Sequence, residues 1–134
     1  MLYNIKTGYS GIEKQRNEDI IILVSSVSRL QEIGVPFVFS DRHAYLQTAR
    51  FSNNPNDLDW IDWNMLAARD FKRDPNDPSK FERYEAETLV RSHVPVAALV
   101  GIGCYNEAVT EAVSAELMAK GTTVPVRNRP RWYF

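Results

Sequence analysis

Short apolar runs, each followed by a turn or capping signal, constrain the fold of this chain most. Residues 19–24 (Asp-Ile-Ile-Ile-Leu-Val) are too short and too rich in β-branched residues for a helix, so they predict a fully buried strand. Ser25 and Ser26 then offer an N-cap for a helix whose apolar stripe ends at Gly34. Residues 35–39 predict a second buried strand.

The rest of the chain divides in the same way. After the second strand, the pattern predicts a helix over 43–51, a loop over 53–57, a short helix over 60–71 and an irregular surface loop over 72–80. A strand is predicted within 84–90, where two glutamates precede an apolar run. The pattern then predicts a strand over 96–105, a helix over 106–120 and a short strand over 124–126. This order lacks the steady βαβ rhythm of a doubly wound sheet, so it predicts a mixed α+β domain.

Length and charge bound the class of protein. The 134 residues suffice for one domain with a real core. The formal net charge of −1 gives no global attraction to nucleic acid or to an anionic membrane, so DNA binding would need a local basic patch. A single cysteine, Cys104, and two histidines, His43 and His93, argue against a disulfide and against a metal site. We expect a soluble protein with no membrane partner, because no apolar run nears ~18 residues. We expect it in the cytoplasm, because a single cysteine suits a reducing compartment.

A pair of glutamates, Glu85 and Glu87, opens the strand predicted within 84–90. Glutamate is a poor strand residue, and positions two apart in a strand face the same side. Neighbouring carboxylates are one way to build an acid–base site, but exposed carboxylates at a sheet edge explain this spacing at least as well. A hydrolase pair is a weaker interpretation, because neighbours on one strand face converge poorly on the two sides of a scissile bond.

Two other regions carry polar groups suited to binding. Residues 40–43 (Ser-Asp-Arg-His) follow a predicted buried strand, where sites are commonly built, although helix capping and surface solvation also suit His43. Basic and aromatic residues interleave over 60–84, a pattern suited to single-stranded nucleic acid although aspartates dilute its charge.

Several remaining residues are predicted to be structural. Gly101 and Gly103 lie in an apolar strand, where glycine relieves crowding rather than binding phosphate. Cys104 is expected in the core, His93 in an exposed turn, and the aromatic tail of residues 132–134 docked on the protein.

Taken in order, short motifs across almost the whole chain resemble the DarT family of toxins, NAD-dependent DNA ADP-ribosyltransferases distantly similar to the poly-ADP-ribose polymerase fold. The matching motifs are Met1-Leu2-Tyr3, Leu23-Val24-Ser25-Ser26, Phe37-Val38-Phe39-Ser40-Asp41-Arg42-His43-Ala44, Ala86-Glu87-Thr88-Leu89-Val90 with Val94-Pro95, Gly103-Cys104-Tyr105 and Arg131-Trp132-Tyr133-Phe134. The Ala-Glu-x-Leu-Val element is the most specific of them.

The resemblance implies an α+β, mixed-sheet ADP-ribosyltransferase-like fold with Glu87 as the catalytic glutamate. It implies that NAD is a substrate, that no metal takes part, and that a thymidine or guanosine of single-stranded DNA accepts the ADP-ribose. Residues 72–84 would meet the target nucleotide, and Arg42, His43 and Arg83 are the candidates for holding the strand. The expected protein partner is a macrodomain antitoxin of the DarG type.

Family members continue upstream of the Met-Leu-Tyr motif, in a segment that supplies part of the nicotinamide pocket. We therefore expect residues 1–134 to be the C-terminal portion of one such domain, shortened at its N-terminus and weakly active or inactive alone. The alternative is a non-catalytic remnant that binds single-stranded nucleic acid or the antitoxin. Replacing Glu87 with alanine separates the two, because a binding module would keep its binding.

Overall fold

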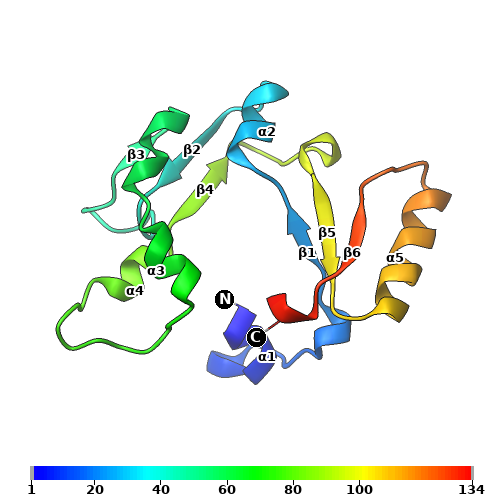
Figure 1. Cartoon of the computed structure of the whole chain (residues 1–134), viewed down its shortest axis with the longest axis horizontal. Coiled ribbons are helices and arrows are strands. Elements are labelled where there is room, and N and C mark those ends of the chain that lie inside the picture. The colour runs from blue at the N-terminus through cyan, green and yellow to red at the C-terminus, as the bar shows by residue number, and fades with distance from the viewer. Residues whose placement is uncertain (1, 134) are drawn as a thin grey trace. The chain divides into compact units, whose positions relative to one another are not determined.

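A computed structural model of the chain describes residues 2–133, and their contacts divide the chain into two compact units. The first unit comprises residues 1–29 and 95–134, and the second comprises residues 30–94. The boundary falls inside helix α2 (Val27–Glu32). Each unit contains one sheet, and the two sheets are drawn with their helices in Figure 1.

The sheet of the first unit has the order β1-β5-β6, formed by β1 (Ile22–Val24), β5 (Gly101–Cys104) and β6 (Val126–Asn128). β1 runs antiparallel to β5, whereas β6 runs parallel to it because helix α5 (Glu107–Ala119) connects the two as a crossover. This unit also contains helix α1 (Leu2–Thr7) and the 3₁₀ turns Tyr9–Gly11, Asn17–Asp19, Val96–Ala98 and Pro130–Trp132.

The C-terminal segment docks on this sheet, as predicted for Trp132 and Tyr133; Phe134 lies outside the described residues. Tyr133 is 3% exposed, and its hydroxyl lies 2.8 Å from the carbonyl oxygen of Ile20 and 2.9 Å from that of Gly103. Cys104 is fully buried, and burial raises the pKa of its thiol. Tyr133 is therefore part of the core of this unit.

The sheet of the second unit is antiparallel, with the order β3-β2-β4. Its strands are β2 (Phe37–Ser40), β3 (Phe51–Ser52) and β4 (Glu87–Val90), and between β3 and β4 lie the 3₁₀ segment Pro55–Trp60, helix α3 (Trp63–Ala68) and helix α4 (Lys80–Tyr84). The core includes Phe39, which is 2% exposed. The helices and the mixed and antiparallel sheets confirm the predicted α+β class.

The capping signals were informative. The Ser26 hydroxyl accepts a hydrogen bond from the Arg29 N–H at the start of α2, and Gly34, with φ of +69°, follows its end. Asn106 caps α5 by accepting from the Val109 N–H at 2.9 Å, and Gly121 follows with φ of +66°. These two of the predicted helices are thus confirmed, each followed by the predicted glycine.

The structure differs from several predictions about local structure. The strand expected over 96–105 is limited to β5, because Val96–Ala98 forms a 3₁₀ turn, and the loop expected over 53–57 contains the start of the 3₁₀ segment Pro55–Trp60. The strand expected over 19–24 is limited to β1 and is not fully buried, since Leu23 is 58% exposed. Glu85 follows the unpredicted helix α4 and lies outside β4, so it does not share a strand face with Glu87. Residues 43–51 contain no helix, because the N–H groups of Ala44 and Arg50 bond to carboxylates instead of helical carbonyls.

Among residues 2–133, no helix combines the length and the apolar character needed to cross a bilayer. The same residues contain no group of three or more His, Cys, Asp or Glu side chains placed to hold a metal ion.

Candidate active site

Glu87 is the first residue of β4 and pairs across the ladder with Ser40, the last residue of β2. Its Oε1 atom accepts a hydrogen bond from the Ala44 N–H at 2.8 Å and lies 3.3 Å from Nδ1 of His43. The side chain is 37% exposed, and no partner within the described part of the chain lies on Oε2. One oxygen is therefore held by the protein, whereas the other has no hydrogen-bond partner among the described residues.

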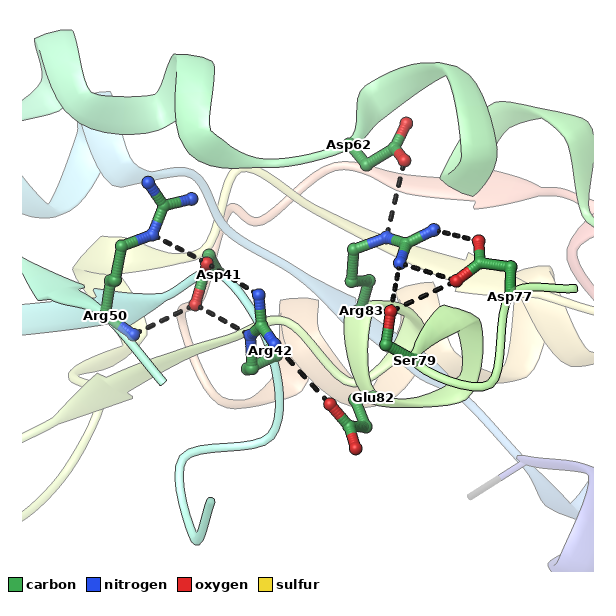
Figure 2. Close-up of polar contacts among 8 residues, drawn as sticks. All are labelled: Asp41, Arg42, Arg50, Asp62, Asp77, Ser79, Glu82 and Arg83. Carbon is green, nitrogen blue, oxygen red and sulfur yellow. Dashed lines mark hydrogen bonds and ion pairs between the residues drawn. The ribbon is translucent and has the colours of Figure 1, made fainter. Parts of the chain in front are cut away.

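The segment that contacts Glu87 connects β2 to β3 and is closed at its base by Asp41 and Arg50. The Asp41 carboxylate accepts from the Arg50 N–H at 3.0 Å and from Arg50 Nε at 2.8 Å, while the Asp41 N–H donates to the Arg50 carbonyl at 3.3 Å. We call this set of contacts the Asp41–Arg50 clamp (Figure 2). Residues 42–49 therefore form a loop whose two ends are held together by these contacts.

The electrostatics of Asp41 follow from its surroundings. The residue is 3% exposed, and burial disfavours its charged form. Hydrogen bonds from the backbone and guanidinium of Arg50, and from Arg42, outweigh that penalty and lower the pKa of the carboxyl below its ordinary value. Asp41 is therefore a buried anion held by two arginines.

Residues 72–84 fold around the guanidinium group of Arg83. Arg83 makes a bidentate contact with Asp77, at 3.1 and 2.6 Å, and also donates to the Ser79 hydroxyl at 2.7 Å (Figure 2). A carboxylate oxygen of Asp62 lies 3.5 Å from Arg83 Nε. A groove of about 490 Å³ lies along this segment, lined by Arg73, Asp74, Pro75, Asp77, Pro78, Phe81 and Glu82.

The structure brings some predicted site residues together and gives others structural partners. His43 lies against Glu87, as a shared site requires. Arg42 lies 3.5 Å from Glu82 and 3.4 Å from Asp41, so it links the connection after β2 to α4. Arg83 is 23% exposed and engaged by Asp77.

Two contributors to the site were not singled out from sequence: Arg50 and the Ala44 N–H. The only signal that pointed near them was the polar run over 40–43 after a strand. A backbone N–H leaves no mark in a sequence, and the pairing of Arg50 with Asp41 depends on the path of the connection between them.

Acid is expected to destabilise this unit. The pKa of Asp41 and that of Asp77, which Arg83 lowers by hydrogen bonding, both lie below the ordinary 3.8. A lowered folded-state pKa contributes stability that is fully present above the unfolded-state value and is lost as pH falls through the folded-state value. Urea unfolding should therefore give a constant free energy from about pH 7 to 5 and a fall below about pH 4. An Asp41→Asn variant should show a flatter acid limb; an identical limb would contradict this assignment.

Comparisons with known proteins show the family to which this chain belongs. A family model described as ssDNA thymidine ADP-ribosyltransferase, DarT, matches residues 1–134. A DNA ADP-ribosyl transferase of Escherichia coli O127:H6 (strain E2348/69) is 47% identical over 134 residues, which are 100% of this chain and 62% of that protein. The chain thus spans less than two thirds of the length of this curated relative.

Solved structures show the same likeness. Thermus sp. 2.9 DarT in complex with NAD+ matches with a TM-score of 0.86 at 33% identity, over 99% of this chain and 66% of that one. The same protein in complex with ADP-ribosylated ssDNA gives a TM-score of 0.85 at 33% identity, over 99% and 63%. Thermosipho africanus DarTG in complex with ADP-ribose, at 14% identity and a TM-score of 0.67 over 100% and 33%, is similar in fold alone. Because the family model spans the whole chain, the chain belongs to the DarT family.

Proposed function

We propose that this chain carries the catalytic glutamate of a DNA ADP-ribosyltransferase, which transfers ADP-ribose from NAD to a thymidine or guanosine base of single-stranded DNA. The observation that carries the proposal is the Glu87 carboxylate, held through Oε1 at the start of β4 with Oε2 open. The relatives support the two substrates, since Thermus sp. 2.9 DarT is described in complex with NAD+ and with ADP-ribosylated ssDNA.

The chemistry suits a carboxylate that acts without metal. The bond between the nicotinamide nitrogen and C1′ of the ribose breaks through an oxocarbenium-like transition state, nicotinamide leaves, and C1′ bonds to the acceptor base. Glu87 would accept a hydrogen bond from the ribose 2′-hydroxyl and stabilise the developing positive charge. The proton lost by the base would pass to a carboxylate or to water, which closes the balance of the reaction.

The groove along residues 72–84 supports a role for this segment in meeting the target strand. Its Glu82 end adjoins the site, because the Glu82 carbonyl accepts from the His43 N–H at 3.1 Å. We propose that Arg42, His43 and Arg83 bind the DNA strand. The three residues differ in which existing contacts they would have to give up. His43 is exposed beside Glu87, Arg42 has only long ionic contacts that a phosphate can replace, and Arg83 would have to exchange its bidentate contact with Asp77.

The protein partner proposed from the family resemblance is a macrodomain antitoxin of the DarG type, which makes the chain the toxin of a toxin–antitoxin pair. We also propose that residues 1–134 are one portion of the family domain and that they act in the cytoplasm, where NAD and transiently single-stranded DNA are both present. A growth defect on expression, relieved by the antitoxin, would support the pairing.

The proposal is tested by incubating the 134-residue chain with NAD and single-stranded oligonucleotides that each lack one base. Because residues 1–134 are expected to be weakly active by themselves, we expect slow nicotinamide release and a low yield of an ADP-ribose adduct that disappears when the target base is removed, with no adduct on duplex DNA. Binding of the oligonucleotide without any adduct would contradict transfer and favour the non-catalytic alternative.

A further inference from the structure

We propose that Asp41 is a positioning residue for Glu87, acting through Arg50 and the connection between β2 and β3. This inference rests on the proposed function. It goes beyond it by assigning a role to a buried carboxylate whose polar partners are Arg42 and Arg50 rather than Glu87 or the residues that line the groove. Three observations carry it: the burial of Asp41, the closure of the connection at its base, and the contacts that the connection makes with Glu87.

The burial of Asp41 requires an explanation, because an ionised carboxylate is costly to bury unless it is paired and hydrogen-bonded. Arg50 supplies a backbone donor and a side-chain donor, and Arg42 adds two longer contacts at 3.4 Å. The Arg50 guanidinium also stacks over the Trp60 ring, with its carbon 4.8 Å from the ring centroid. Arg50 is therefore fixed between Asp41 and Trp60.

Because the two ends of the connection between β2 and β3 are held together, the backbone between them has few possible conformations. Within it, the Leu46 N–H donates to the His43 carbonyl and the Ala49 N–H donates to the Leu46 carbonyl, which makes two consecutive tight turns. The buried Ser40 hydroxyl donates to the Arg42 carbonyl at 2.6 Å. These bonds, with the Asp41–Arg50 clamp, leave few alternative paths for residues 42–49.

The connection in turn orients Glu87. The Ala44 N–H holds Oε1, and the His43 ring lies beside the same oxygen. Catalytic groups lose much of their efficiency when they are misplaced by even a small distance. A charge buried at the base of the connection would thus affect the reaction through geometry, without contact with substrate.

The test compares Asp41→Asn with Asp19→Asn in the 134-residue chain. Asp19→Asn is the matched control, because Asp19 also pairs with an arginine at 2.8 Å but lies in the first unit. Loss of charged hydrogen bonds should make hydrogen exchange of the Ala44 amide about ten- to hundredfold faster in Asp41→Asn only. Amides of the β2–β4 ladder should keep their protection. The kcat for ADP-ribose transfer should fall about tenfold or more, with little change in KM for the oligonucleotide.

Unchanged exchange at Ala44 in a folded Asp41→Asn protein would overturn the inference, and so would faster exchange with an unchanged kcat. If Asp41→Asn loses the protection of the β2–β4 amides, Arg50→Met tests the inference instead, by the same measurements of Ala44 exchange and kcat. Arg50→Lys is expected to give values closer to those of the wild type, because it retains the positive charge. Absence of transfer by the wild-type chain would contradict the proposed function instead. The exchange at Ala44 would then still uphold or overturn the positioning of Glu87.

Discussion

Replacing Glu87 with glutamine is expected to lower the rate of ADP-ribose transfer by about 10²- to 10⁴-fold, the range typical of losing a positioned acid–base group. Glutamine has the same shape, and its amide oxygen still accepts from the Ala44 N–H, so β4 and the connection after β2 should stay in place. The substitution removes the negative charge that, under the proposed function, stabilises the oxocarbenium-like transition state. Single-turnover kinetics with NAD and a single-stranded oligonucleotide measure this directly.

Glu85→Gln is the matched control. Glu85 is exposed, follows α4 and lies outside the strand, so its replacement should leave the transfer rate within about twofold of the wild type. Equal losses in the two variants would show that general negative charge matters rather than Glu87. Oligonucleotide binding should survive in both variants, and an unchanged transfer rate in Glu87→Gln would remove Glu87 from the catalytic role.

Local signals in the sequence predicted much of the fold because the physical causes are local. Serine at 26 and asparagine at 106 cap helices, and glycines at 34 and 121 follow helix ends with positive φ. These effects act within one turn of the chain, so the sequence displays them. The alternation of short strands and helices likewise predicted the α+β class.

The site was predictable only in part because its contacts join distant segments. Glu87 was proposed as the catalytic residue through a family resemblance, since the spacing of Glu85 and Glu87 by itself favoured an exposed sheet edge. The error over residues 43–51 has the same origin. Ala44, Leu46 and Ala49 suit a helix, but the N–H of Ala44 bonds to a carboxylate 43 positions away. Tertiary partners override such propensity, and only the structure shows them.

Replacing Gly103 with alanine is expected to destabilise the first unit by about 1–3 kcal/mol, the usual range for overpacking. A Cβ at this position would lie 2.8 Å from two ring carbons of Trp132, closer than carbon atoms can approach, so the ring and the docked segment of residues 130–133 must move.

Gly101→Ala in the same strand is the matched control, because its Cβ would meet only the Pro125 carbonyl oxygen at 3.5 Å. That variant should be neutral or slightly more stable, since alanine reduces the entropy of the unfolded chain. Urea unfolding followed by circular dichroism compares them. In a Trp132→Ala background the penalty of Gly103→Ala should vanish, because the atoms it would strike are gone; an undiminished penalty would assign the cost to the strand itself.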